Sequence, residues 1–259
     1  MTKPILIICL ALIGAWIKPL LAASYPHTLE AEVDQIYAVA DETVKERLAQ
    51  LDQSFVEYRF DPSVRRLIRM YVERWRKGTA RILGRTTRYF PYFTEQLEAQ
   101  EMPEAIKYLS ITESALRPFA VSYVGAGGLW QLMPGTAREL GLTVNNEVDE
   151  RFDLVKGTEA GLRYLQIQYE MFGDWALAMA AYNSGPGRVI RAKRRSGSSN
   201  YWKLRRYLPR ETSTYVPGFI AATYLVTYFS QHELKAASVD LDAQLTEVIP
   251  VYEFLSLHR

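Results

Sequence analysis

DPSVRRLIRMYVERW, residues 61–75, is the stretch with the strongest structural signal in this sequence. Asp61 is a preferred helix N-cap, and Pro62 suits the first helical position because the N–H it lacks would be unpaired there. Apolar residues then recur three and four positions apart, at Val64, Leu67, Ile68, Tyr71, Val72 and Trp75. This spacing predicts an α-helix that buries one face.

Helical signals continue on both sides of this stretch. Upstream, residues 24–61 are acidic and carry apolar residues at helical spacing, which predicts a solvated amphipathic helix. Downstream, helices are expected over 89–97, from Pro103 onward, from an N-cap at Thr158 to a stop at Gly173, over 175–183 after an N-cap at Asp174, and over 215–229. The 175–183 helix is apolar or small on nearly every face and is expected at the centre. Because alternating strand patterns are missing, the sequence predicts an all-α fold.

The first 23 residues have the pattern of an export signal. Lys3 precedes an apolar run of thirteen residues from Pro4 to Trp16, which is too short for a bilayer core of about 30 Å. We therefore expect a cleaved signal peptide at residues 1–23 and an exported, periplasmic protein; an uncleaved membrane anchor is the alternative. Cys9 is not preceded by the small residue of a lipoprotein signal, so a lipid anchor is not expected.

Composition excludes several other classes of protein. With 259 residues, 48% of them hydrophobic and 23% charged, the chain can bury a core, which excludes wholesale disorder. Cys9 is the only cysteine and the three histidines are scattered, so no disulfide, thiolate nucleophile, metal site or cofactor is expected. Without residues 1–23, basic and acidic residues balance at 29 each, which argues against a globally basic nucleic-acid binder.

PEAIKYLSITES, residues 103–114, places a carboxylate on an apolar helix face. Ile106, Leu109 and Glu113 are three and four positions apart and therefore share one side of a helix. Burial favours the neutral form of a carboxyl group and raises its pKa, as a glycosidase general acid requires. A buried glutamate satisfied by a structural partner is the alternative, and it is the commoner case for a lone residue.

Two further segments carry polar groups beside glycines. SYVGAGGLWQ, residues 122–131, combines three glycines with Trp130 and Gln131. Glycines allow close approach of a ligand, tryptophan can stack on a sugar and glutamine can bond its hydroxyls; a turn beside a core tryptophan is the alternative. AAYNSGPG, residues 180–187, on its own indicates only the end of a helix followed by a turn.

Taken together and in this order, these segments resemble the family 1 lytic transglycosylases, and most closely their membrane-bound transglycosylase D branch. These enzymes cleave peptidoglycan and have a lysozyme-like fold. The resemblance covers residues 62–229, and the matching positions are the Glu-Ser motif at Glu113 and Ser114, the glycine motif at Gly125, Gly128, Leu129, Trp130 and Gln131, the Ala-Tyr-Asn motif at Ala181, Tyr182 and Asn183, and a later active-site tyrosine at Tyr215.

The resemblance implies a catalytic acid at Glu113. It also implies substrate-binding roles for Ser114, Gly128, Trp130, Gln131, Tyr182, Asn183 and Tyr215, with no metal and no cofactor. The implied domains are a helical extension over 24–100, a lysozyme-like catalytic domain over 101–232, and a tail over 233–259 without a LysM sugar-binding repeat. The implied substrate is the glycan strand of peptidoglycan, cut between MurNAc and GlcNAc to leave a 1,6-anhydroMurNAc end.

The acids near Glu113 in the sequence favour a mechanism with one carboxylate. None occurs between Glu113 and Glu139, and the acids around Arg151 are better explained by ion pairing or helix capping. Most glycosidases use two carboxylates, but substrate-assisted families are exceptions. A lysozyme-type hydrolase and a non-catalytic wall-binding protein are the two alternatives.

A basic stretch follows the last of these motifs. Residues 175–210 hold nine Lys and Arg and no acid, with Tyr201, Trp202 and Tyr207 interleaved. A nucleic-acid surface would fit this pattern, but the export signal and the balanced charge count against it. A solvated face is the leading interpretation and attraction to anionic peptide stems the second. A peripheral association with the wall or outer membrane is compatible with either one.

Overall fold

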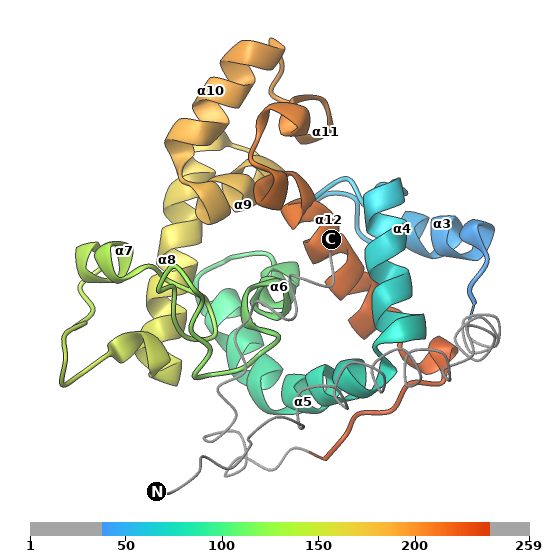
Figure 1. Ribbon diagram of the computed structural model, residues 1–259, viewed down its shortest axis with the longest axis horizontal. Coiled ribbons are helices and arrows are strands. Elements are labelled where there is room, and N and C mark those ends of the chain that lie inside the picture. Colours follow the sequence, from blue (N-terminus) through green and yellow to red (C-terminus); the bar gives the residue numbers. More distant parts are fainter. Residues whose placement is uncertain (1–37, 239–259) are drawn as a thin grey trace, which may run out of the picture. The chain divides into compact units, whose positions relative to one another are not determined.

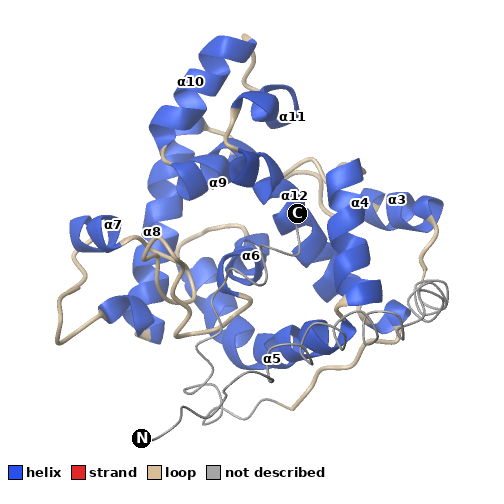
Figure 2. Ribbon diagram, in the orientation of Figure 1, coloured by secondary structure: helices blue, strands red, loops and turns tan. Residues whose placement is uncertain are grey.

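The computed structural model describes residues 38–238, and this part of the chain consists of helices joined by loops (Figure 1, Figure 2). Within the described residues there is no strand, and extended backbone pairs only at three isolated bridges. The predicted mainly helical fold is confirmed for this range. The expected signal peptide and most of the C-terminal tail lie outside the described residues.

The helices follow one another along the chain, with longer connections at residues 50–61, 115–133 and 140–149. In order they are α3 (Asp41–Ala49), α4 (Pro62–Arg69), the π-helical η1 (Met70–Arg74), α5 (Arg76–Ala99), the 3-10 turn η2 (Glu104–Tyr108), α6 (Leu109–Ser114), α7 (Pro134–Glu139), η3 (Glu150–Phe152), α8 (Leu154–Phe172), α9 (Trp175–Ser184), α10 (Pro186–Ser196), α11 (Tyr201–Leu204), η4 (Arg205–Tyr207), α12 (Arg210–Tyr228) and η5 (Ser230–His232).

Two of the predicted helix starts are confirmed by their cap geometry. The Asp61 side chain accepts a hydrogen bond from the Ser63 amide at the start of α4, and Asp174 accepts one from Leu177 at the start of α9. Each bond satisfies an amide that has no partner within its helix.

The predicted cap at Thr158 is wrong. Helix α8 begins at Leu154, and its N-cap is Asp153, whose carboxylate accepts from the amides of Val155 and Lys156. Thr158 is fully buried one turn inside the helix. The predicted stop at Gly173 is confirmed, because this residue adopts the left-handed conformation (φ 61°) that ends helices.

Helix α5 is much longer than the segment predicted over 89–97. It begins at Arg76 and continues through Pro91. The first half carries glycines, threonines and arginines that obscure the helical period. Burial of its apolar residues supports the helix instead: Ile82 and Phe93 are fully buried and Leu83 is 2% exposed. Helix α12 likewise begins at Arg210, before the predicted 215, and continues through Pro217.

Helices α9 and α12 form the centre of the fold. Helix α9 contacts α8, α10 and α12, and α12 in turn contacts α4 and α6 (Figure 1). Leu177 and Ala180 of α9 are fully buried, as are Phe219 and Ala222 of α12. The prediction that the 175–183 helix is central is therefore confirmed.

The segment upstream of α5 shares this core. Arg47 of α3 donates a hydrogen bond to the Tyr224 hydroxyl of α12 at 3.0 Å, and the Tyr228 hydroxyl donates to the Arg47 carbonyl at 2.8 Å. Phe55 packs on Phe219 with ring centroids 5.6 Å apart. These contacts anchor α12, and α12 carries one of the residues predicted for the site.

Candidate active site

Glu113 and Tyr215 meet where α6 and α12 cross. Glu113 lies in the last turn of α6, and the Tyr215 hydroxyl of α12 donates a hydrogen bond to its Oε1 atom. A Cβ on Gly218, one turn further along α12, would lie 3.3 Å from the Thr112 methyl group. The glycine therefore allows the close approach of the two helices on which the hydrogen bond depends.

The environment of Glu113 favours its protonated form. The residue keeps some exposure to solvent, but burial of its carboxyl group raises the pKa to about 8. The hydrogen bond from Tyr215 opposes this rise, because it stabilises the carboxylate, whereas the nearby charge of Glu211 adds to it. At neutral pH the carboxyl group therefore holds a proton that it can donate.

Glu211 is the group that the sequence reasoning missed. It is exposed in the first turn of α12, four residues before Tyr215, and its charge raises the pKa of Glu113. Glu211 is far from Glu113 in the chain, whereas the expectation of a single carboxylate rests on the acids closer to Glu113 in the sequence. The signal that could have found it is the spacing in ETSTY, since residues four apart share a helix face.

Tyr182 supports the site from α9. Its hydroxyl donates to the backbone carbonyl of Trp130 at 2.6 Å, and the residue is only 8% exposed. Burial, with a smaller contribution from the charge of Glu113, raises the pKa of both Tyr182 and Tyr215 well above the ordinary value. Both hydroxyls therefore stay protonated and act as donors.

Ser114 links the end of α6 to the glycine-containing loop, residues 115–133. It is buried, and its hydroxyl donates to the carbonyls of Leu129 at 2.9 Å and Ser110 at 3.1 Å. Ala115 and Leu116, which follow it, have positive φ angles of 52° and 60°. Two successive left-handed residues are costly for side chains with a Cβ, so the surrounding contacts must hold this turn.

Gly128 is required by packing of the chain on itself. Its φ is +81°, and a Cβ there would lie 2.0 Å from the Arg151 carbonyl oxygen. Gln131, only 9% exposed, donates from its side-chain amide to the Ala120 and Gly128 carbonyls, each at 2.9 Å. The sequence predicted that a ligand lies close to these glycines. At Gly128 the group that lies close is instead the protein's own backbone, at Arg151.

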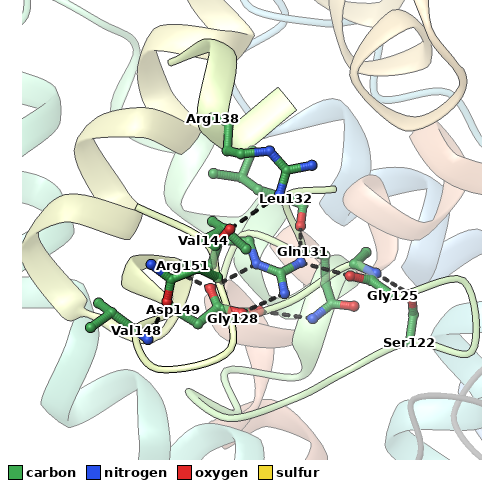
Figure 3. Close-up of polar contacts among 12 residues, drawn as sticks. Ser122, Gly125, Gly128, Gln131, Leu132, Arg138, Val144, Val148, Asp149 and Arg151 are labelled. Atoms are coloured by element: carbon green, nitrogen blue, oxygen red, sulfur yellow. Dashed lines mark hydrogen bonds and ion pairs between the residues drawn. The ribbon is translucent and has the colours of Figure 1, made fainter. Parts of the chain in front are cut away.

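Arg151 holds this loop in place through hydrogen bonds to its backbone (Figure 3). Its guanidinium donates to the Gly125 carbonyl at 2.6 Å and the Leu132 carbonyl at 2.8 Å, and it forms an ion pair with Asp149 at 2.6 Å. The prediction that the acids around Arg151 are engaged in ion pairs and caps is confirmed, since Asp153 caps α8 as well.

Trp130 lies behind the site. It is 2% exposed, its ring centroid is 5.1 Å from that of Phe93, and a Cβ on Gly161 would meet it at 2.7 Å. Its Nε1 donates to the Thr158 hydroxyl at 3.1 Å. Because both neighbours cover the ring, the expectation that this indole stacks on a sugar is corrected: its contacts are those of a core residue.

Asn183 connects the two central helices beside the site. It is partly exposed, and its Oδ1 accepts a hydrogen bond from the Thr212 hydroxyl at 2.7 Å. The predicted residues thus fall into two groups. Glu113 and Tyr215 are in direct contact. The hydrogen bonds of Ser114, Trp130, Gln131, Tyr182 and Asn183 go instead to other groups of the loop and the helices.

The described residues contain neither a cluster of metal ligands nor a helix that could span a membrane. No group of three or more His, Cys, Asp or Glu side chains there could hold a metal ion. None of the helices among residues 38–238 is both long and apolar enough to cross a membrane.

Comparison with known proteins adds the following similarities. Residues 91–205 match the family described as the transglycosylase SLT domain. The chain is 37% identical over 165 residues to the membrane-bound lytic murein transglycosylase D of Escherichia coli strain K12, covering 62% of this chain and 36% of that protein. It is 35% identical over 107 residues to the soluble lytic murein transglycosylase of the same strain, covering 39% and 17%.

Among solved structures, the crystal structure of the 70 kDa soluble lytic transglycosylase from Escherichia coli matches with a TM-score of 0.49 and 23% identity, covering 76% of this chain and 35% of that one. The chain thus spans about a third of the length of the first curated relatives it matches. The family resemblance predicted from the four motifs is confirmed by these similarities.

Proposed function

We propose, from the premise that residues 91–205 form a transglycosylase SLT domain of the family 1 lytic transglycosylases, that this chain cleaves the glycan strands of peptidoglycan. The bond cut is the β-1,4 bond between MurNAc and GlcNAc, and the product ends in 1,6-anhydroMurNAc. The observation that carries the proposal is the buried carboxyl group of Glu113, whose pKa is raised to about 8. A general acid needs a pKa near the working pH, and this group has one.

In the first step Glu113 protonates the glycosidic oxygen. The C1–O bond then breaks and the leaving sugar departs with a free hydroxyl, while the substrate's own N-acetyl group stabilises C1. Glu113 is left as a carboxylate, and the Tyr215 hydroxyl that already donates to it stabilises the new charge. The hydrogen bond gains strength as the charge develops, which is how a donor lowers a barrier.

In the second step the carboxylate of Glu113 takes the proton from the MurNAc 6-hydroxyl. That oxygen attacks C1 and closes the anhydro ring, so the proton returns to Glu113 and no water is consumed. The attacking group is part of the substrate, and a well-oriented intramolecular reaction has an effective concentration of about 10⁵ M or more. One carboxyl group therefore serves as acid and then as base.

The other predicted residues support this pair in distinct ways. We assign substrate contact to Asn183, which is partly exposed beside the first turn of α12. Ser114, Gly128, Gln131 and Tyr182 are buried or nearly so, and we assign them the positioning of the loop and of Glu113. Trp130 anchors the same loop to α8 through Thr158.

Hydrolysis is the second candidate reaction, and Glu211 is the observation that favours it. Its charge is close enough to Glu113 to raise that group's pKa, so a second carboxylate is present near the acid. An inverting hydrolase uses such a carboxylate to activate water. We place hydrolysis second because Glu211 is exposed on the surface of α12.

Mass spectrometry of digested cell-wall sacculi separates the two reactions. Transglycosylation leaves muropeptides lighter by one water than the hydrolytic products and without a reducible end. A digest dominated by reducible MurNAc ends would show that the chain is a hydrolase. The Glu113→Gln variant is the control and should lose a factor of about 10² to 10⁴ in rate under either mechanism. Full activity in that variant would end the assignment of the acid.

The proposal includes two predictions made from the sequence. Residues 1–23 are a cleaved export signal that delivers the protein to the periplasm. Residues 24–100, of which the structure describes 38–100, are an N-terminal extension of the catalytic domain at 101–232. N-terminal sequencing of the protein recovered from the periplasm should find a start near Ala23 or Ser24. Recovery of a chain that begins at Met1 in the membrane fraction would contradict the first of these.

A further inference from the structure

Seven exposed cations gather on α10, α11 and the segment that follows them. They form what we call the basic surface: Arg188, Arg191, Arg194, Arg195, Lys203, Arg206 and Arg210. Helix α10, α11 and η4 contact one another, so the cations of all three share one region of the fold (Figure 1). From Trp175 to Arg210 the sequence contains no Asp or Glu.

Buried apolar residues and an aromatic ring hold cations of the basic surface in place. Helix α10 buries Val189 and Ala192, which directs the cations of this helix outward. The Tyr207 ring lies under two guanidinium groups, with centroid distances of 5.3 Å to Arg195 and 4.9 Å to Arg206. These contacts join α10 to η4 and hold charged groups from two elements side by side.

The charges of the basic surface are not neutralised within the described residues. None of the seven cations forms an ion pair with a carboxylate of residues 38–238. Arg205, in the same stretch, shows the contrast, because it pairs with Asp61 at 2.9 Å. Seven like charges held together repel one another, and an anionic partner would relieve that repulsion.

Both ends of the basic surface adjoin the candidate active site. Helix α10 begins two residues after Ser184, which follows Asn183, and Arg210 directly precedes Glu211. The hydrogen bond between Asn183 and Thr212 brings the two ends of the basic surface close together. The basic surface therefore begins next to residues that lie near Glu113, within reach of a polymer held there.

We propose that the basic surface binds the carboxylates of the peptide stems carried by the glycan strand. The inference rests on the proposed function, since it concerns the same polymer. Two other anionic partners fit less well. Stable binding to a membrane surface combines basic charge with apolar side chains that insert, and Ile190, 44% exposed, is the only large exposed apolar residue between 175 and 210. A single-stranded nucleic acid stacks its bases on open aromatic faces, but Tyr201 is buried and the guanidinium groups of Arg59 and Arg205 lie against the Trp202 ring.

The test compares two triple variants with the same change of charge. One removes Arg191, Arg194 and Arg195 from the basic surface as R191Q/R194Q/R195Q. The matched control removes three exposed cations of α5 and α8 as K77Q/R81Q/R163Q. Each is made in the Glu113→Gln background, and binding is measured by co-sedimentation with intact sacculi and with glycan strands freed of their stems by an amidase.

In low salt the basic-surface variant should bind stem-bearing sacculi about tenfold more weakly than its parent, from three contacts each of modest strength. The ratio of its affinity for stem-bearing sacculi to its affinity for stem-free strands should fall by the same factor. The same ratio for the control variant should not change. The difference should disappear at about 0.5 M NaCl, because salt screens exposed charges. A thermal melt of each variant checks that it is folded.

Three outcomes would overturn the inference. The first is an equal loss of binding to stem-bearing sacculi in both triple variants, which would reflect the change in net charge alone. The second is an unchanged affinity ratio in the basic-surface variant. The third is a loss of binding to phosphatidylglycerol vesicles or duplex DNA without a loss on sacculi. Failure of the parent chain with Glu113 intact to cleave any glycan would refute the proposed function instead, and the stem binding would still be measured.

Discussion

Replacing Glu113 by glutamine should make the protein more stable at neutral pH. The substitution keeps the shape of the side chain and an acceptor for the Tyr215 hydroxyl, but it removes the titratable group. In the folded protein the pKa of Glu113 is raised by burial from 4.5 to about 8. Between these two values the folded chain holds a proton that the unfolded chain releases. The stability of the wild type therefore falls as the pH rises through this window.

The size of the effect follows from the same two values. At pH 7 the unfolded carboxyl group is 2.5 pH units above its ordinary pKa of 4.5, while the folded one is still mostly protonated. At 1.36 kcal/mol per unit this penalises the wild type by roughly 3 kcal/mol. Near pH 4 both states are protonated and the penalty vanishes. Glutamine carries no such penalty at any pH.

Urea unfolding and thermal unfolding of both proteins, each at pH 4, 5.5 and 7, measure the difference. The variant should gain stability over the wild type with rising pH, and at pH 7 its melting temperature should be higher by about 6 to 12 °C, given 2 to 4 °C per kcal/mol for a chain of this size. Glu98→Gln, at an exposed position of α5, is the control and should show little change. If the Glu113→Gln variant gains no stability relative to the wild type between pH 4 and pH 7, the burial of this carboxyl group is refuted.

Three further predictions concern the same site and its supporting loop. Tyr215→Phe removes the hydrogen bond that stabilises the carboxylate of Glu113, so that group's pKa should rise further, and the basic limb of the kcat/KM profile should move up by about one to two pH units. Glu211→Gln removes the like charge, so the same limb should move to lower pH, by less than about one unit because the exposed charge is screened, and the shift should shrink in high salt. Gly128→Ala should destabilise by several kcal/mol in urea unfolding, because its Cβ would lie 2.0 Å from a carbonyl oxygen, whereas Gly125→Ala, with the same sign of φ and nothing within 4 Å, should cost only about 1 kcal/mol. Equal losses in the two alanine variants would contradict the packing argument.

Local patterns predicted the features that depend on neighbours in the chain. The cap at Asp61 and the apolar face of α4 follow from residues within one or two turns. The stop at Gly173 follows from one residue's tolerance of a positive φ. The wrong cap at Thr158 is a local error, because the true cap, Asp153, bonds only to amides two and three residues further on. In helix α5, by contrast, distant contacts outweigh local preference. The first half of α5, with its glycines and threonines, is helical because its apolar residues are buried against other elements.

The sequence by itself determined the helical class, the family motifs and the identity of Glu113 as a carboxylate on an apolar helix face. Only the tertiary structure decided what surrounds that carboxylate. Tyr215 lies 102 residues further along the chain and reaches Glu113 because α12 crosses α6. Glu211 comes near by the same crossing. Trp130, whose type suits sugar binding, is covered by Phe93 and Gly161. The physical reason is that pKa and accessibility depend on the atoms packed around a group, and those atoms come from helices that no local pattern brings together.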